Sequence, residues 1–409
     1  MKTSPPRGMN DMMPDDMSLR DAVQGAIIAT YRDYGYQRIS TPILEDAENL
    51  QKSEGGDNLN LIYQVMKRGD KLQEALKDGD QLWDLGLRYD LTLPLARYFA
   101  NNHAKLPTPF KVIQTDRVYR AERPQRGRLR EFVQCDIDII GDAGLRAEAE
   151  LIAVTAQALL NVGFSGFAVR INDRRVLNAL FVALGFGDAQ IPVALVAFDK
   201  LDKVGMEGVC AELVEKAMPP AAIEQLSAFM KNDDLLEALL AMNLDLPEAF
   251  ALRSLIDELR IVGGSNWTIE FDLSLVRGQG YYTGAVFEIV SSDFEGSIAG
   301  GGRYDTMIEK FTGISTPAVG FSIGFERIIT MLKERGFKPP AQKPALALLY
   351  ADENTFPHVF AQIQVLVQDY LVTALPLNTG NPGRQRARLA REGFGYVKLM
   401  EGDVRSLNE

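Results

Sequence analysis

The segment RVYRAERPQRGRLREFVQCDID, residues 117–138, decides the fold because its second half alternates apolar and polar residues with a period of two. Alternation in a strand sends successive side chains to opposite faces. One face is apolar and carries Leu129, Val133, Cys135, Ile137 and Ile139. The opposite face is polar or aromatic and carries Arg128, Arg130, Phe132, Gln134, Asp136 and Asp138. The turn residues of 124–127 precede this run, so the segment predicts a β-hairpin with one buried face.

The polar face of this hairpin suits a ligand that carries both phosphate and amine groups. Six arginines lie between Arg117 and Arg130, in a chain whose formal net charge is −11. Guanidinium groups match phosphate oxygens with a fork of donors, carboxylates accept from an ammonium or a ring N–H, and Phe132 offers a ring for stacking. Cross-strand ion pairs on a solvated sheet would explain the same pattern. The hairpin alone leaves both interpretations open.

Length and composition limit the class of protein. The chain has 409 residues, 46% of them hydrophobic, which indicates a globular protein of two or three domains. No run approaches the roughly 18 apolar residues of a membrane span, and the N-terminus has no apolar signal-peptide core, so we expect a cytoplasmic protein with no membrane partner. Because the chain has two cysteines and two histidines, we expect no disulfide framework, no protein metal site and no Ser-His-Asp triad.

The order of the patterns predicts an α+β protein built in several parts. Apolar residues at helical spacing from Leu19 to Tyr31 predict a helix, and residues 37–46 predict a strand that Pro42 places at an edge or interface. From 175 to 262 helices are broken by Gly and Pro, which predicts an inserted module with a structural or RNA-supporting role. Strand patterns return from 263 to 337.

Two further features complete the outline. The Pro-rich stretch 338–344 predicts a linker into a small α/β domain at 345–409. The glycines of 278–284 do not fit a dinucleotide-binding loop, because a strand pattern follows where a helix would be needed. The glycines of 300–302 allow close approach of a ligand or of another strand.

Five segments, in this order along the chain, resemble motifs of the class II aminoacyl-tRNA synthetases and, among them, the histidyl-tRNA synthetases. YGYQRISTPILE (34–45), RVYRAERPQRGRLREF (117–132) and GFSIGFERI (320–328) are similar to motifs 1, 2 and 3 of that class. LVRGQGYYTG (275–284) and GGGRYD (300–305) are similar to the two histidine-specific signatures. The resemblance covers residues 1 to about 335.

The resemblance implies an antiparallel catalytic sheet flanked by helices. Its catalytic core would comprise residues 1–174 and 263–337, with 175–262 as the helical insertion and 345–409 as a truncated anticodon-binding-like domain. It further implies ATP and Mg²⁺ as cofactors, histidine and the tRNA acceptor end as partners, and a homodimer formed through motif 1.

The resemblance also implies residue roles. ATP would be bound by Arg120 at the α-phosphate, Glu122 at the adenine amino group, Phe132 by stacking, Arg327 at the outer phosphates, and Arg128. The α-amino group of histidine would be bound by Asp90, Thr92 and Gln134, and its imidazole by Asp138 and Tyr282 with Tyr281 beside them. Arg277 would stabilise the α-phosphate in the transition state, together with Arg120.

The implied reaction activates histidine with ATP and transfers it to tRNA. Gly280 stands where the family carries a carboxylate, and the tail after 344 is shorter than the family's anticodon-binding domain, which implies a weakened anticodon contact. A catalytically idle histidine-binding paralogue, such as the regulatory subunit of ATP phosphoribosyltransferase, is the alternative. The retention of Arg120, Glu122, Arg277 and Arg327 favours the ligase. A nucleotide-binding module without chemistry would leave Gln134, Asp138 and Tyr282 without a role.

Overall fold

The structure is a computed structural model that describes residues 1–52, 59–242, 244–276, 281–337, 343–351 and 354–407. The chain divides into two compact units, Met1–Phe337 and Lys338–Glu409. Each unit has its own sheet and its own hydrophobic core.

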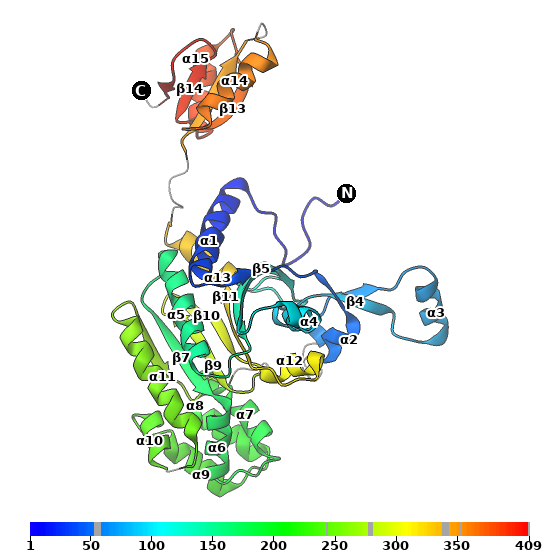
Figure 1. The fold of residues 1–409 in the computed structure, drawn as a ribbon, viewed down its shortest axis with the longest axis vertical. Helices are drawn as coiled ribbons and strands as arrows, with labels where there is room; N and C mark the ends of the chain where they lie inside the picture. Colours follow the sequence, from blue (N-terminus) through cyan, green and yellow to red (C-terminus); the bar gives the residue numbers. More distant parts are fainter. Residues whose placement is uncertain (53–58, 243, 277–280, 338–342, 352–353, 408–409) are drawn as a thin grey trace. The chain divides into compact units, whose positions relative to one another are not determined.

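Within the described residues, the first unit is built on an eight-stranded sheet with the order β1-β5-β6-β11-β10-β9-β7-β8 (Figure 1). The strands are β1 Gln37–Arg38, β5 Phe110–Tyr119, β6 Glu131–Ile140, β7 Phe167–Asp173, β8 Trp267–Phe271, β9 Ala285–Ser291, β10 Phe294–Arg303 and β11 Ala318–Gly324. The central pairings are antiparallel, and the parallel pairs β1·β5 and β7·β8 lie at the two edges. The predicted α+β fold class with an antiparallel sheet is therefore confirmed.

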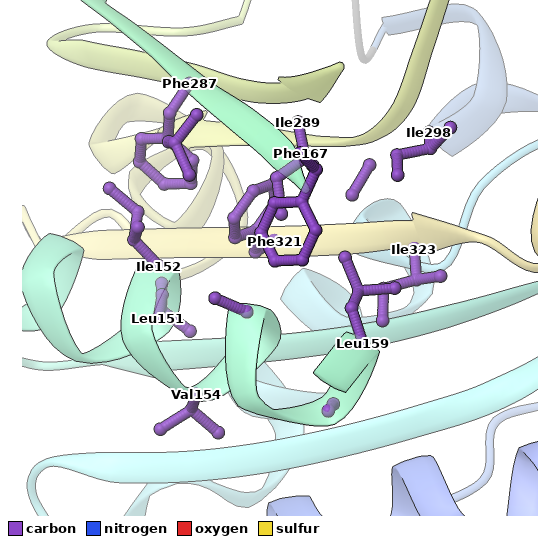
Figure 2. Close-up of a cluster of buried hydrophobic side chains, with 14 of the residues drawn as sticks. Leu151, Ile152, Val154, Leu159, Phe167, Phe287, Ile289, Ile298, Phe321 and Ile323 are labelled. Atoms are coloured by element: carbon purple, nitrogen blue, oxygen red, sulfur yellow. The ribbon is translucent and has the colours of Figure 1, made fainter. Parts of the chain in front are cut away.

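One face of this sheet is covered by helices. These are α1 Pro14–Asp33, α5 Arg146–Asn161, α11 Pro247–Gly263 and α13 Phe325–Glu334. Figure 2 shows Leu151 and Ile152 of α5 facing Phe287 and Phe321 of the sheet, and all four side chains are almost completely buried. Burying each such side chain contributes about 1.5–3 kcal/mol relative to leaving it exposed. The apolar face of the sheet is thereby fixed, and the polar face is left for other uses.

The predicted hairpin is confirmed as β5 and β6, but its strands are shorter than the alternation indicated. Strand β5 ends at Tyr119 and β6 begins at Glu131. Beyond these ends, the backbone N–H of Arg120 still donates to the Arg130 carbonyl at 2.9 Å. The N–H of Arg130 donates to the Gly8 carbonyl at 2.8 Å, so the N-terminal segment takes a group that strand pairing would have used. The N–H of Arg128 donates to the Gln125 carbonyl at 3.0 Å within the turn. Arg128 and Arg130 therefore lie in the loop before β6, and their prediction as strand residues was wrong.

The predicted strand through Pro42 is also wrong. β1 ends at Arg38, and a second strand, β2 Leu44–Asp46, begins after Pro42 in a different sheet of order β2-β4-β3. Proline cannot donate to a strand ladder, and the buried Arg88 guanidinium occupies the bend by donating to the Thr41 carbonyl at 2.8 Å. The elements of this region are α2 Ala47–Lys52, β3 Gln64–Met66, α3 Asp70–Asp78, β4 Trp83–Leu87, α4 Thr92–Asn102 and, later in the chain, α12 Asp305–Thr312.

The described residues of 174–242 form helices joined by short loops, and they pack around a separate hydrophobic core that includes Leu180, Phe198 and Leu213. The helices before α11 are α6 Arg174–Ala183, α7 Ile191–Phe198, α8 Leu201–Glu215, α9 Pro220–Phe229 and α10 Leu235–Ala241. Helix α11 then returns the chain along the sheet to β8 (Figure 1).

The second unit is a small α/β fold with strand order β13-β12-β14-β15. Its elements are β12 Ala345–Tyr350, α14 Phe356–Leu366, β13 Leu371–Pro376, α15 Pro382–Arg391, β14 Tyr396–Leu399 and β15 Arg405–Ser406. A search of the described helices of the whole chain finds none with the length and apolar character needed to cross a membrane.

Candidate active site

The polar face of β6 forms part of the floor of a cleft of about 1100 Å³. Its walls include residues of β9, β10 and β11, the loop between β5 and β6, the starts of α4, α8 and α13, and the segment after β8. The predicted site residues that lie among the described residues all line this cleft: Asp90, Thr92, Arg120, Glu122, Arg128, Phe132, Gln134, Asp138, Tyr281, Tyr282 and Arg327. Arg277 and Gly280 lie outside the described residues.

The floor of the cleft is acidic and buried. Asp90, Asp136 and Asp138 are 4%, 4% and 3% exposed. Burial raises the pKa of Asp90 to about 6 and that of Asp138 to about 7. Burial, followed by the negative charge of Asp138, raises the pKa of Asp136 well above its ordinary value. We call these three side chains the acidic floor.

Three buried acceptors on or beside this floor have no hydrogen-bond partner among the described residues, and one of them is Asp136 Oδ1. Asp90 precedes α4, and its Oδ1 accepts from the Leu93 backbone N–H at 3.2 Å, while its Oδ2 has no partner. The Gln134 amide nitrogen donates to the Ser322 hydroxyl at 2.8 Å, which leaves its Oε1 without a partner. Buried acceptors of this kind suit a cationic group such as an ammonium.

Asp138 is held from two neighbouring segments. The Tyr304 hydroxyl donates to its Oδ1 at 2.6 Å. Gly320 of β11 is its register partner, and a Cβ at that glycine would lie 1.9 Å from the same oxygen. A side chain at position 320 would therefore displace the carboxylate. Sequence reasoning did not assign Tyr304 to the site, although the segment GGGRYD that contains it was noted.

The aromatic wall beside Asp138 consists of Tyr281 and Tyr282, which are 6% and 8% exposed. Their ring centroids are 4.7 Å apart, and the Tyr281 ring meets the edge of Tyr304 at 6.2 Å. A Cβ at Gly302 would lie 2.8 Å from the Tyr282 ring, so the glycines of β10 make room for this wall.

The other end of the cleft is basic and more exposed. Arg120 donates to the Tyr89 carbonyl at 3.0 Å, and its guanidinium lies 5.1 Å from the Phe132 ring centroid. Glu122 pairs with Arg128 at 3.4 Å, so two residues predicted to bind ATP contact each other. Arg327 lies 5.7 Å from the Phe294 ring centroid and donates to the Ser297 carbonyl. We call Arg120, Arg128 and Arg327 the basic rim.

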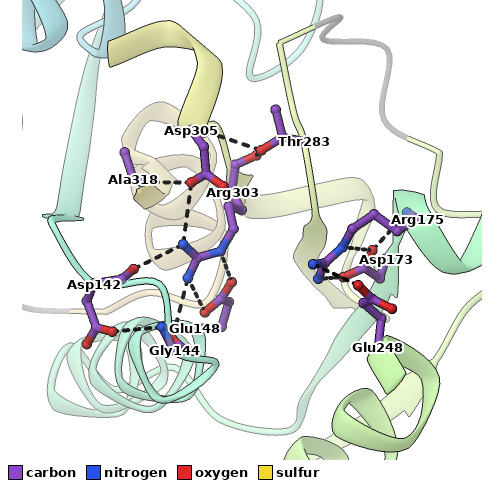
Figure 3. Close-up of polar contacts among 10 residues, drawn as sticks. All are labelled: Asp142, Gly144, Glu148, Asp173, Arg175, Glu248, Thr283, Arg303, Asp305 and Ala318. Atoms are coloured by element: carbon purple, nitrogen blue, oxygen red, sulfur yellow. Dashed lines mark hydrogen bonds and ion pairs between the residues drawn. The ribbon is translucent and has the colours of Figure 1, made fainter. Parts of the chain in front are cut away.

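A buried ion pair supports the segment that carries Tyr304 but does not line the cleft. Figure 3 shows Arg303, at the end of β10, pointing toward Glu148 of α5. The guanidinium Nε and Nη2 donate to the two Glu148 carboxylate oxygens at 2.6 and 2.8 Å, and Nη1 donates to the Asp142 carbonyl at 3.0 Å. The two side chains are 5% and 0% exposed. No local pattern pointed to this pair, because its members are 155 positions apart.

The antiparallel sheet carries an arginine-rich hairpin loop, and its strand β11 leads into a helix with a cleft-lining arginine, Arg327. These features place this chain among the class II aminoacyl-tRNA synthetases. Within that class the chain belongs to the histidyl-tRNA synthetase family, whose family model, described as Histidyl-tRNA synthetase, matches residues 8–328.

Individual relatives agree with this assignment. A histidine–tRNA ligase from Leifsonia xyli subsp. xyli (strain CTCB07) is 45% identical over 345 residues, covering 81% of this chain and 80% of its own. A probable histidine–tRNA ligase from Tropheryma whipplei (strain Twist) is 37% identical over 422 residues, covering 98% of this chain and 96% of its own. The crystal structure of histidyl-tRNA synthetase from Nostoc sp. PCC 7120 superposes with a TM-score of 0.79 at 28% identity, covering 97% of this chain and 91% of that one. The last two similarities extend into the C-terminal unit.

Proposed function

We propose that this chain is a histidine–tRNA ligase that activates histidine with ATP and transfers it to the acceptor end of tRNA. The observation that carries the proposal is the cleft of the family's catalytic sheet, in which a buried acidic floor meets an arginine-rich rim. A ligand that is cationic at one end and polyanionic at the other would satisfy both parts.

The acidic floor would bind the amino acid. Asp90 Oδ2 and Gln134 Oε1 are buried acceptors available to the α-ammonium group, and Thr92 lies at the start of the same helix as Leu93. Asp138 and Tyr282 would bind the imidazole. A pKa of about 7 allows Asp138 to ionise when an imidazole N–H or imidazolium reaches it.

The basic rim would bind ATP. Arg120 would contact the α-phosphate and Arg327 the outer phosphates, while Glu122 and Arg128 would exchange their contact with each other for contacts with the nucleotide. Phe132 would stack on the adenine with the ring face that Arg120 leaves open.

Mg²⁺ usually binds through one or two carboxylates together with the substrate's phosphates. The described residues contain no cluster of three or more His, Cys, Asp and Glu side chains suited to hold a metal ion. Glu288 lines the cleft and would be one protein ligand of an ion that enters with ATP. When bound, the ion would neutralise phosphate charge.

The reaction needs no nucleophilic side chain. A carboxylate oxygen of histidine forms a bond to the α-phosphorus, the bond from that phosphorus to the β-phosphate bridging oxygen breaks, and pyrophosphate leaves. A terminal ribose hydroxyl of tRNA then attacks the acyl carbon and releases AMP. Negative charge on the phosphoryl oxygens is stabilised by fixed guanidinium groups, so the protein acts by positioning and electrostatics.

The acceptor end of tRNA would reach the same cleft, and the C-terminal unit would contact the anticodon through exposed arginines of α15, which include Arg384, Arg386, Arg388 and Arg391. The paralogue reading, a regulatory subunit of ATP phosphoribosyltransferase, is not favoured, because the curated relatives that match most of the chain are named histidine–tRNA ligases.

We also propose a homodimer that forms through the motif 1 segment. Its short strand β1 lies at the edge of the main sheet, and the nearby apolar side chains of Ile43 and Leu44 are 40% and 43% exposed. An open edge with apolar neighbours favours association with an identical surface. Analytical ultracentrifugation at micromolar concentration is expected to give a dimer, and a monomer there would refute this part of the proposal.

The central test of function is ATP–pyrophosphate exchange with each of the twenty amino acids, followed by tRNA charging. Exchange is expected with histidine alone, and charging is expected to follow it. Histidine binding without exchange would overturn the ligase and support a sensing role.

A further inference from the structure

We propose that the N-terminal segment holds the hairpin loop of the cleft, residues 120–130, in position for ATP, with Gly8 and Arg130 as positioning residues. This loop joins β5 to β6 and carries Arg120, Glu122 and Arg128, which the proposed function assigns to ATP. The inference therefore rests on the proposed function. The resemblance described above gives no role to Gly8 or to Arg130.

Arg130 ties the two ends of the hairpin loop together. Its carbonyl oxygen accepts from the backbone N–H of Arg120 at 2.9 Å. Its guanidinium Nε donates to the carbonyl oxygen of Glu122, also at 2.9 Å. The position of the backbone at two residues assigned to ATP therefore depends on where Arg130 lies.

Gly8 of the N-terminal segment holds Arg130 from outside the hairpin. Its carbonyl oxygen accepts from the backbone N–H of Arg130 at 2.8 Å. A Cβ at position 8 would lie 2.7 Å from Cγ of Pro124 and 2.9 Å from Cγ of Arg130. Neither atom is the free end of a flexible side chain, so a side chain at position 8 would push the segment and the loop apart. Gly8 also has a φ of +82°, a left-handed conformation that favours glycine.

Other contacts would keep the hairpin loop attached if the Gly8 contact were weakened. The backbone N–H of Ala121 donates to the Leu61 carbonyl at 2.9 Å, and Arg126 pairs with Glu334 at 2.6 Å. The N-terminal segment packs less densely nearby, because its residues 10–12 and residues 127 and 129 of the loop line a cavity of about 490 Å³. A substitution at Gly8 should therefore shift the loop without unfolding the chain.

A shift of the hairpin loop should affect the two small substrates differently. The residues assigned to ATP lie in the loop, whereas Gln134 and Asp138, assigned to histidine, lie within β6. Strand β6 is held by its ladders with β5 and β11, and the Gly8 contact belongs to neither ladder. We therefore expect a change in ATP binding with little change in histidine binding. A purely structural role of Gly8 would instead reduce the fraction of active protein and leave KM for ATP unchanged.

The test compares Gly8→Ala with Gly166→Ala in the full-length protein. Gly166 has a φ of +72°, no atom within 4 Å of a Cβ built on it, and no place in the lining of either cavity. The control therefore introduces similar backbone strain without touching the loop. We expect Gly8→Ala to raise KM for ATP in pyrophosphate exchange about tenfold and to leave the calorimetric Kd for histidine within about twofold. Gly166→Ala should leave both values within about twofold of wild type.

An unchanged KM for ATP in Gly8→Ala, an equal rise in Gly166→Ala, or equal losses for ATP and histidine would overturn the proposal. If Gly8→Ala does not fold, as judged by its thermal transition, Arg130→Met is measured in the same way. That variant keeps the backbone N–H that meets Gly8 and loses the Nε bond to Glu122, so the same rise in KM is expected. Wild-type protein without pyrophosphate exchange would instead refute the proposed function, so the two failures are distinguishable.

Discussion

The Arg303–Glu148 pair and the acidic floor are both buried sets of ionisable side chains, but only the first pairs a cation with an anion. Every nitrogen of the Arg303 guanidinium has an acceptor, and both Glu148 oxygens accept from it. Asp90 and Asp136 each retain an oxygen without a hydrogen-bond partner among the described residues. Removing charge from water is costly unless it is paired. The paired charges compensate each other's loss of hydration, whereas the acceptors without a partner lose theirs uncompensated, and a bound cationic ligand would offset that cost.

The largest expected effect comes from unbalancing the paired cluster. Glu148→Gln removes the nearer counter-charge of the buried Arg303 guanidinium and leaves only the Asp305 carboxylate at 3.4 Å, so it should lower the free energy of unfolding by about 3 kcal/mol. The matched control is Glu334→Gln, which breaks the exposed Arg126–Glu334 pair at 2.6 Å. That change should cost no more than about 1 kcal/mol. Urea denaturation followed by circular dichroism measures both, and equal losses would show that burial does not separate the two pairs.

The second expected effect is on binding by the unbalanced cluster. Asp138→Asn removes the charge that faces the imidazole and should weaken histidine binding about 10- to 100-fold, because hydrogen bonds to charged groups are the stronger ones. ATP affinity should stay within about twofold, since the basic rim is unchanged. Calorimetric titration with each ligand checks this. Parallel losses for histidine and ATP would mean that the amino-acid end of the cleft has been assigned wrongly.

The third expected effect is a loss of stability of the ligand-free protein as pH rises. The folded-state pKa values of Asp90 and Asp138, about 6 and about 7, lie above the ordinary value of 3.8. The native state therefore binds protons more tightly than the unfolded state, and the stabilising contribution of these groups is full below about pH 4 and lost as pH rises through 6 to 7. In ligand-free protein the free energy of unfolding should therefore fall as pH rises, and Asp138→Asn should make that fall smaller by on the order of 1 kcal/mol or more.

Thermal unfolding of wild-type and Asp138→Asn protein from pH 5 to pH 8 measures that difference. The affinity of the wild type for histidine should rise over the same pH range, because the ionised carboxylate is the form that binds. A variant curve parallel to that of the wild type would show that Asp138 is ionised throughout.

The smallest effect is expected at the basic rim. Arg128 and Glu122 form a pair at 3.4 Å whose side chains are 47% and 24% exposed. Arg128→Ala should change the free energy of unfolding by less than about 1 kcal/mol. It should raise KM for ATP in pyrophosphate exchange by several-fold and leave KM for histidine unchanged. A large loss of stability would mean that the rim, like the Arg303–Glu148 pair, is part of the folding core.

The hairpin illustrates how far local pattern carries a prediction. The alternation from Val133 to Ile139 predicted both the strand and its buried face, because side-chain direction in a strand depends only on position parity. The same rule failed at Arg130, whose backbone N–H donates to the Gly8 carbonyl of a distant segment. Local sequence cannot indicate a competitor that is brought in by the fold.

The candidate site likewise contains some residues that the sequence predicted and others that only the fold revealed. Gln134 and Asp138 were predictable from the alternation in residues 117–138 and Asp90 from the family resemblance, and the cleft contains all three. The contributions of Tyr304 and Ser322 became visible only when β10 and β11 were placed beside β6. Hydrogen bonds such as Tyr304 to Asp138 join residues 166 positions apart and leave no periodic trace in the sequence.

The sequence by itself determined the antiparallel hairpin, the family and the polar side chains that face the cleft, because these depend on local alternation and on short motifs. Only the tertiary structure decided which buried charges are balanced and which are not. Charge balance in the interior is a property of groups within about 4 Å of one another. Glu148 and Arg303 are 155 positions apart in the sequence and form an ion pair in the fold. The carboxyl groups of the acidic floor instead oppose one another's ionisation, which a bound cation would offset.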